Sequence, residues 1–160
     1  MSVKAAYVMP MNDFDFFTGT WDTANRRRTD YLDPNSEWEE FPSINHASRH
    51  FDGSAHFDEV TFPTKGYAGL TLRLLDPDTG QWSLYWVSKK NPVMLPPVVG
   101  QFKDGVGDFF CEDDYNGVPV LVRYRWSDIT ADSARWAQAF STDGGESWLD
   151  NWHMDMTRRH

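Results

Sequence analysis

The chain has 160 residues, enough for one domain with a sizeable core, and a formal net charge of −9. This charge argues against a nucleic-acid partner, because phosphate binding needs a basic face, and it disfavours anionic membrane surfaces. Aromatic residues make up 16% of the sequence, with eight tryptophans, which suits strands and a pocket for a flat or apolar ligand. For any single tryptophan, a place in the ordinary core is the simpler interpretation.

The N-terminal region carries no targeting signal that we can identify. The first ten residues lack the apolar core of a signal peptide, and no stretch of the sequence is long and apolar enough for a membrane helix. The single cysteine, Cys111, excludes an intramolecular disulfide. Its acidic neighbours Glu112, Asp113 and Asp114 disfavour a reactive thiolate, so we interpret Cys111 as structural. We therefore expect a cytoplasmic protein.

The chain begins with a loose tail over residues 1–10 and then turns aromatic. Asn12 or Asp13 is placed to cap a single helical turn through Phe14–Phe17, whose rings would plug one end of a barrel. A series of strands follows. We expect these strands over residues 19–31, from 37 onward, 56–62, 67–75, 82–87, 99–103, 107–112, 118–127, 133–141 and 147–157. The region 42–56 is the hardest to assign, because it holds Pro42, Gly53 and three histidines.

Turn chemistry separates the later strands. Asp76-Pro77-Asp78-Thr79-Gly80, Asp104-Gly105, Asn116-Gly117 and Asp143-Gly144-Gly145 each lie between runs of aromatic and β-branched residues. Asn-Gly and Asp-Gly supply the positive φ angles of tight hairpins, so the pattern predicts an antiparallel meander. Closing such a meander removes its exposed edges. We predict an all-β fold: one antiparallel up-and-down barrel of about eight to ten strands over residues 1–160.

One connection differs from the hairpins. The segment 88–98 is apolar and contains Pro92, Pro96 and Pro97, which donate no ladder hydrogen bonds, so it cannot be a central strand. It is either a lid over the barrel mouth or a packed crossover, and we favour the crossover.

The first strand carries a recognisable pattern. Gly19-Thr20-Trp21, after a short aromatic turn, resembles the Gly-x-Trp signature of lipocalins and the wider calycin group. In those barrels the Trp plugs the closed end, and a basic residue from the last strand packs across its ring. The resemblance implies that Trp21 and Arg158 close the barrel through a cation–π contact, with Arg159 as the second choice.

The resemblance extends from Asp13 to Arg158 and points to a bacterial family of small lipocalin-like proteins of unassigned function. It is carried by Asp15-Phe16-Phe17-Thr18-Gly19-Thr20-Trp21, Leu72-Arg73-Leu74-Leu75-Asp76-Pro77, Trp82-Ser83-Leu84-Tyr85-Trp86, Pro96-Pro97-Val98-Val99-Gly100, Arg125-Trp126-Ser127-Asp128-Ile129-Thr130, and Asn151-Trp152 with Asp155-Met156-Thr157-Arg158. The resemblance implies a fold and a cavity, not a reaction.

Two patterns suggest chemistry that we do not assign. Residues 141–148 fit the Asp-box of sialidases, but a sialidase propeller needs far more chain, so we interpret the box as a hairpin. His46, His50 and His56 invite a metal site. On a strand, positions four apart lie roughly 13 Å apart, beyond one metal's ligands, so solvated loop histidines are the favoured interpretation. A haem role for His153 rests on a lone histidine. We predict no metal and no cofactor.

Charged and polar side chains on the predicted strands are candidate ligand contacts. Arg123 and Arg125 share a face, with Arg73 on a neighbouring strand, and the apolar opposite face favours an outward direction. On the first strand, Arg27 lies on the same face as Trp21, so its side chain could point into the barrel near the open end. Alternation along the last strand puts Asp150 on one face with Trp148 and Trp152, where it could act as an acid or base. We favour the alternative that Asp150 faces water near the end of the strand.

Three hypotheses follow for function. The first is binding of a small hydrophobic or aromatic molecule inside the barrel. Its candidate contacts are Arg27, Tyr85, Trp86, Tyr124, Trp136, Gln138 and Trp152. The second is a cofactor-independent isomerase or cyclase in the same cavity, using Asp150, Tyr85 or an Arg; whether any reaction is catalysed stays open. The third is an interaction protein with a filled barrel, and a homodimer is left open as an assembly.

Overall fold

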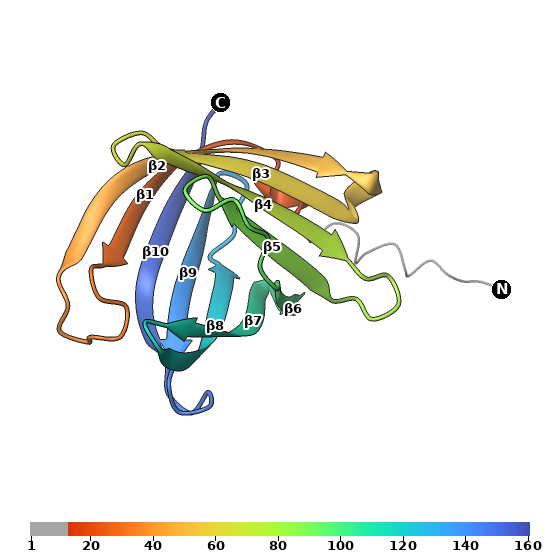
Figure 1. The fold of residues 1–160 in the computed structure, drawn as a ribbon. Helices are drawn as coiled ribbons and strands as arrows, with labels where there is room; N and C mark the ends of the chain where they lie inside the picture. The colour runs from red at the N-terminus through yellow and green to blue at the C-terminus, as the bar shows by residue number, and fades with distance from the viewer. Residues whose placement is uncertain (1–12) are drawn as a thin grey trace.

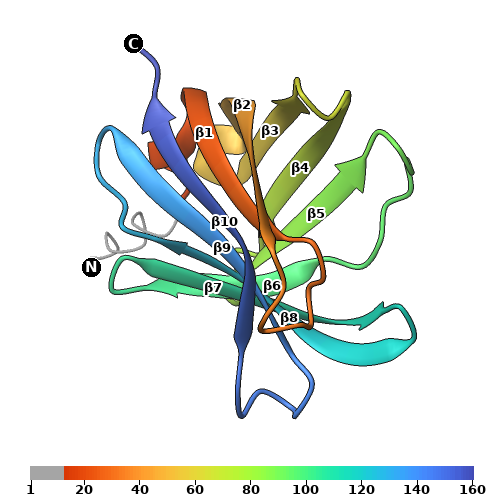
Figure 2. The same cartoon turned by 90° about the vertical axis from the view of Figure 1, so that its left-hand side faces the viewer.

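The computed structural model describes residues 13–160, which form a closed ten-stranded antiparallel barrel (Figure 1). The strands are β1 (Gly19–Arg28), β2 (Trp38–His50), β3 (Ala55–Phe62), β4 (Tyr67–Leu75), β5 (Trp82–Ser88), β6 (Val98–Lys103), β7 (Val106–Tyr115), β8 (Val118–Ser127), β9 (Ser133–Ser141) and β10 (Leu149–Arg158). Each strand pairs with its sequence neighbour, and β1 pairs with β10 to close the sheet (Figure 2). The predicted all-β, up-and-down barrel is confirmed. The prediction that residues 1–160 form one domain stays a prediction, since residues 1–12 are not described.

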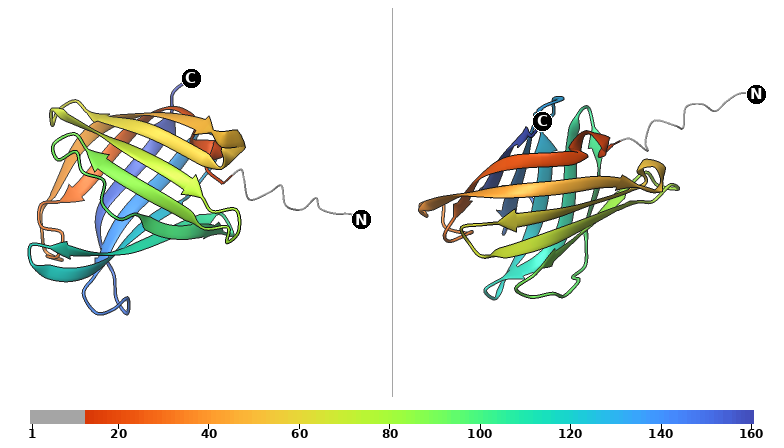
Figure 3. Two further views of the ribbon diagram at one scale, coloured as in Figure 1. Left: turned by 45° about the vertical axis from the view of Figure 1, so that its right-hand side comes forward. Right: turned by 90° about the horizontal axis from the view of Figure 1, so that it is seen from above.

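The tight hairpins follow from their turn residues. Asn116 and Gly117 have φ angles of 50° and 86°, and Asp104 and Gly105 have φ angles of 53° and 80°. Two successive left-handed residues give a turn whose twist matches that of the flanking strands, as the sequence predicts. Short turns also join β3 to β4 and β4 to β5, and Figure 3 shows these yellow and green strands lying side by side across one side of the barrel.

The region that resists sequence assignment is a single long strand. β2 runs over 13 residues, straight through Pro42, and ends at the short 3-10 turn η3 (Phe51–Gly53). Pairing of β2 with β3 begins only at Ile44, so Pro42 lies where β2 has one paired neighbour, β1. A proline is tolerated there because no ladder bond to a second strand is lost.

One end of the barrel is plugged by the 3-10 turn η2 (Asp15–Phe17). Phe14 and Phe17 are fully buried, as the sequence predicts for an aromatic plug. No side chain caps this turn, which corrects the expected cap from Asp13; Asn12 lies outside the described residues. The Asp13 carboxylate instead accepts a hydrogen bond from Trp82 Nε1 at 2.9 Å. Asp13 therefore ties the plug to the wall of the barrel.

The last strand departs from strict alternation. A bulge between Asp150 and Trp152 moves Asn151 to the inside, where it is fully buried. Asp150 consequently lies outside, and Trp148 packs on the outer face, where its ring centroid is 5.9 Å from that of Phe110. The favoured outward position of Asp150 is therefore correct, and the predicted shared face of Trp148 and Trp152 is wrong.

The proline-rich segment between β5 and β6 is an exposed connection. Val93, Met94 and Leu95 are each more than half exposed. Within the described residues, none from 88–98 lines the interior cavity, so the segment is not a lid. The favoured packed crossover is also wrong, because residues 89–96 are exposed and the segment links the adjacent strands β5 and β6. In the described part of the chain, no helix has the length and apolar character needed to cross a membrane.

Candidate functional site

The barrel interior holds a cavity of about 300 Å³. It extends from the ring of Phe17 in the plug to Tyr31 and Tyr115 at the opposite end of the barrel, which we call the mouth. Its lining residues come from eight of the ten strands, from the plug and from the β1–β2 loop. They are Phe17, Tyr31, Asn45, Asp58, Val60, Thr71, Arg73, Leu84, Trp86, Asp113, Asp114, Tyr115, Tyr124, Trp126, Trp136, Gln138, Phe140, Trp152, Met154 and Met156.

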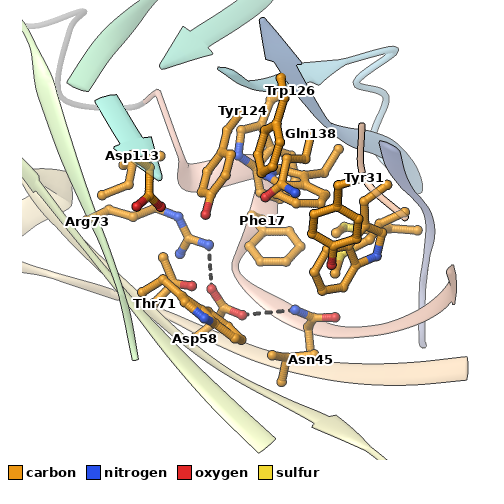
Figure 4. Close-up of a pocket in the computed structure, with 18 of the residues that line it drawn as sticks. Phe17, Tyr31, Asn45, Asp58, Thr71, Arg73, Asp113, Tyr124, Trp126 and Gln138 are labelled. Carbon is orange, nitrogen blue, oxygen red and sulfur yellow. Dashed lines mark hydrogen bonds and ion pairs between the residues drawn. The ribbon is translucent and has the colours of Figure 1, made fainter. Parts of the chain in front are cut away.

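A buried ion pair forms the polar floor of this cavity (Figure 4). Asp58 on β3 and Arg73 on β4 are 2% and 3% exposed, and the Arg73 guanidinium donates to Asp58 Oδ1. The second carboxylate oxygen of Asp58 accepts a hydrogen bond from Asn45 Nδ2 at 2.9 Å, and Asn45 Oδ1 accepts one from Thr23 at 3.1 Å. A buried charge needs such a pair, because desolvating it alone is costly. The carboxylate is thus held in place at the cavity wall.

The same network fixes the protonation of His56, which is 1% exposed. Arg73 can only donate, so its contact of 3.1 Å with His56 Nδ1 makes that nitrogen the acceptor. The proton then lies on Nε2, which donates to the hydroxyl of Thr18 at 3.1 Å. Burial, followed by the Arg73 charge, lowers the pKa of His56 to about 3. His56 is therefore neutral, and Asp58 alone balances Arg73.

Aromatic rings form the middle of the cavity. The indoles of Trp136 and Trp152 meet edge to face with centroids 5.5 Å apart, and Tyr124 meets Trp136 in the same manner at 5.0 Å. Such edge contacts hold rings at fixed angles. Trp152 Nε1 also donates to Asn25 at 3.0 Å, which fixes the orientation of its indole. The wall is therefore rigid and presents ring faces and edges to the interior.

A second polar group lies among these rings. Gln138 Nε2 donates to Asn151 Oδ1 at 2.9 Å, which leaves the Gln138 carbonyl free to accept. Asn151 Nδ2 is buried without a hydrogen-bond partner among the described residues. Burial also raises the pKa of Tyr124 far above its usual value, so its hydroxyl stays protonated. The interior therefore offers separate donors and acceptors to a bound molecule.

The mouth is partly covered by the β1–β2 loop. The ring of Tyr31 stacks on that of Tyr115 with centroids 5.3 Å apart, and the Tyr31 amide donates to the Tyr115 hydroxyl at 3.2 Å. Burial raises the pKa of Tyr31 to about 12. Asp113 and Asp114, at the end of β7, line the cavity beside these rings and are exposed. The mouth thus combines aromatic rings with two exposed carboxylates.

Five of the seven predicted ligand contacts line the cavity: Trp86, Tyr124, Trp136, Gln138 and Trp152. Arg27 and Tyr85 do not. Arg27 points inward near the mouth, but its guanidinium lies 4.7 Å from the Trp152 ring and pairs with Glu39 at 2.7 Å, behind the cavity wall.

Tyr85 requires a correction, because alternation along β5 puts it on the outer face. Its neighbours Leu84 and Trp86 occupy the inner face and line the cavity. The enzyme hypothesis loses two of its candidate groups, since both Tyr85 and Asp150 lie outside the cavity. The remaining candidates were arginines, and Arg73, the arginine that lines the cavity, is held by Asp58. The structure therefore favours no acid–base chemistry at the predicted residues.

Arg123 and Arg125 lie on the outer face of β8, as favoured. Arg125 Nε donates to Asp108 Oδ1 at 2.7 Å, and the Arg123 guanidinium lies 4.9 Å from the Trp148 ring and 3.5 Å from Asp150. Arg73, which the same argument placed outward, instead lies inside, and it is the arginine that lines the cavity among the described residues.

Sequence reasoning missed Asp58 and His56 as site residues, and it favoured an outward direction for Arg73, which lies inside. His56 was expected to be a solvated loop residue, which is wrong, since it lies inside on β3. A signal existed in the turn Pro63-Thr64-Lys65-Gly66, which sets the register of β3 on β4 and places His56 opposite Arg73. In this register, Asp58, two residues after His56 on β3, lies on the same face of the sheet as His56 and Arg73.

The other histidines gather no metal-binding cluster. His46 is exposed and contacts the Thr20 hydroxyl at 3.2 Å, and His50 is exposed beside Ser48. Among residues 13–160, no group of three His, Cys, Asp or Glu side chains is arranged to hold a metal ion.

The comparisons with known proteins support the fold. No family model matches the sequence, and no curated protein matches it. The solved structure of the S-type phycobiliprotein lyase CPES from Guillardia theta matches with a TM-score of 0.58 and 13% identity, over 98% of this chain and 99% of that one. A DUF3598-family protein of unknown function from Nostoc punctiforme matches with 8% identity and a TM-score of 0.26, over 98% of this chain and 100% of that one. The first match is consistent with a lipocalin-like barrel.

Proposed function

We propose that this protein binds a small hydrophobic or aromatic molecule inside its barrel. The observation that carries the proposal is the cavity of about 300 Å³, walled by tryptophan and tyrosine rings and floored by the Asp58–Arg73 pair. Ligand sites in proteins are mostly apolar hollows with a few fixed polar groups that orient the ligand. A barrel filled by its own side chains would have no such space, so the cavity also argues against the filled-barrel hypothesis.

The size and shape of the cavity narrow the ligand class. Its volume lies at the lower end of the range for small-molecule pockets, about 300–1,000 Å³. A planar molecule of two or three fused rings would contact the indole rings of Trp86, Trp136 and Trp152. The similar solved structure is, by its name, a phycobiliprotein lyase, so a pigment-like molecule such as a bilin is one member of the class to test. A cytoplasmic location and a homodimer stay predictions from the sequence.

A blocking substitution tests the proposal. Thr71 points into the cavity from β4, whereas its neighbour Leu72 lies on the outer face of the same strand. Thr71→Trp would fill the space between floor and wall, and Leu72→Trp adds the same indole outside. The probe is the neutral dye N-phenyl-1-naphthylamine, followed by energy transfer from tryptophan.

We expect saturable binding to the wild type and to Leu72→Trp, and a loss of at least about tenfold in affinity in Thr71→Trp, because the added ring occupies the ligand volume. Circular dichroism and urea denaturation check that both variants fold. The proposal is overturned if the folded wild type does not bind the dye, or if both variants bind it as the wild type does.

A further inference from the structure

We infer that the preferred ligand of this cavity is a planar organic cation, and that anions of the same shape are rejected. The inference rests on the proposed function and names the charge class of the molecule that the barrel would hold. Three features support it: the charges that line the cavity, the aromatic rings that form its wall, and the pairing of the basic side chains in and near the cavity.

Four charged residues line the cavity: Asp58, Arg73, Asp113 and Asp114. At the end of β7, Asp113 is paired with the buried Val120 and lies on the inner face, and Asp114 lies on the outer face beside the mouth. Asp58 and Arg73 neutralise each other in the floor, and His56 beside them is uncharged. Among residues 13–160, neither Asp113 nor Asp114 forms an ion pair. Asp113 accepts a hydrogen bond from the Asp114 amide at 2.7 Å, and Asp114 accepts one from the Gly117 amide at 3.0 Å. A ligand entering the mouth therefore meets net negative charge, and the chain as a whole carries −9.

The wall suits a cation as well. Nine of the lining side chains are aromatic. The face of an aromatic ring carries partial negative charge, and cages of such rings bind organic cations in preference to anions. The barrel already uses its interior rings in this manner. The Arg27 guanidinium lies 4.7 Å from the ring centroids of both Phe41 and Trp152, and Arg73 lies 5.3 Å from that of Phe17.

Arg27 and Lys65 near the mouth share one carboxylate. Lys89 and Lys90 follow β5 at the same end and form no ion pair among the described residues, but they do not line the cavity. Glu39 accepts from Arg27 at 2.7 Å and from Lys65 at 2.6 Å, and neither cation lines the cavity. Inside, the Arg73 guanidinium donates to Asp58 and His56. An anion inside the cavity would therefore have to displace an existing partner of Arg73 before it met a free positive charge. Pigment-like ligands that carry carboxylates should therefore bind this cavity more weakly than cationic ones.

Three naphthalene probes of one ring system test the inference: 2-naphthylmethylammonium, 2-naphthalenemethanol and 2-naphthoate. Each is titrated into the full chain at low salt and followed by tryptophan fluorescence. We expect the ammonium probe to bind at least about tenfold more tightly than the carboxylate, with the alcohol between them, since charges at a solvated mouth contribute modestly. Raising the salt concentration should narrow the difference.

A pair of double variants separates the mouth from overall charge. Asp113→Asn with Asp114→Asn removes the two mouth carboxylates and keeps their amide-accepting oxygens. Asp78→Asn with Asp104→Asn removes the same charge from exposed turns at the plugged end. We expect the mouth variant to lose most of the preference for the ammonium probe, with the alcohol bound as before, and the control variant to keep that preference.

The outcomes are distinct. Equal or tighter binding of 2-naphthoate, or equal effects of the two double variants, overturns the cation inference and leaves the proposed function standing if the neutral alcohol binds. Absence of binding by all three probes overturns both the proposed function and the inference that rests on it.

Discussion

The guanidinium of Arg158 lies 4.4 Å from the centroid of the Trp21 ring, at the register position where β10 pairs with β1. The same group donates hydrogen bonds to the carbonyl oxygens of Phe16, Thr18 and Ala131. One side chain therefore joins the last strand, the first strand and the plug. A closed barrel has no free edge, so this junction helps to hold the cavity in shape.

Replacing Arg158 with Ala should destabilise the barrel. The substitution removes a cation–π contact and leaves three carbonyl groups without their donor, so we expect a loss of about 3 kcal/mol in the free energy of unfolding. Within the described residues, the side chain of the neighbouring Arg159 makes an exposed pair with Asp22, and Arg159→Ala should lose far less stability than Arg158→Ala. Urea denaturation measures both. Equal losses would show that Arg158 does not close the barrel.

Removing one charge of the internal pair should cost more than removing one of an outer pair. Asp58→Asn leaves Arg73 charged and buried, and we expect a loss of about 3–5 kcal/mol in the free energy of unfolding. Asp108→Asn breaks the pair of Arg125 and Asp108, whose side chains are 41% and 31% exposed, respectively. This variant should lose about 1 kcal/mol or less in the free energy of unfolding.

The double variant Asp58→Asn with Arg73→Met removes both internal charges, so it should recover much of the loss in Asp58→Asn. Guanidinium denaturation of the single and double variants gives the coupling energy. A double variant no more stable than the single one would mean that Arg73 does not need Asp58.

Stability should fall as the pH is lowered through the range in which His56 titrates in the unfolded chain. The ordinary pKa of 6.5 is lowered to about 3 in the fold, mainly by burial and then by Arg73. Between pH 6.5 and 3 the unfolded state therefore binds a proton that the native state excludes. The His56 contribution is fully present above pH 6.5 and declines by about 1 kcal/mol per pH unit below it.

The comparison of His56→Gln with His46→Gln isolates this contribution, because carboxylates that titrate in the same range are common to both variants. His46 is exposed, so its variant should keep the wild-type slope of unfolding free energy against pH. His56→Gln should flatten that slope between pH 4 and 6.5. If the curves of unfolding free energy against pH were parallel for the two variants, His56 would not be the source of the pH dependence.

Gly69 should control the position of a cavity wall. A Cβ atom at Gly69 would lie 2.0 Å from the indole of Trp86, so Gly69→Ala must move that indole. We expect a weaker affinity for the neutral naphthyl dye, by about three- to tenfold, because the displaced ring changes the cavity. Adding Trp86→Phe frees the space and should restore stability. Unchanged affinity and stability in Gly69→Ala would show that Trp86 does not depend on this gap.

The strands and the plug could be predicted because local chemistry decides them. Asn116-Gly117 favours a tight hairpin because both residues readily adopt positive φ, and the aromatic residues of the plug, Phe14–Phe17, favour burial. The five lining residues that were predicted lie on strands where the aromatic face is also the inner face, as Trp136 and Gln138 do on β9.

The rest of the site depends on relationships that no single strand reveals. On β4 the apolar face of Leu70 and Leu72 is the outer one, and the face with Thr71 and Arg73 is inside, so the usual assignment of faces fails. Arg73 is stable there only because Asp58 faces it from β3. Likewise, the bulge at Asn151 breaks an alternation that looks regular in the sequence, and only pairing with β9 places it.

Two-dimensional NMR of the eight tryptophan indole N–H groups tests the account most directly. A planar probe that binds inside the barrel should shift the signals of Trp86, Trp126, Trp136 and Trp152, which line the cavity. It should leave those of Trp21, Trp38, Trp82 and Trp148 in place. Shifts confined to Trp38 and Trp148 on the outer face, or no shifts at saturating probe, would contradict an interior binding site.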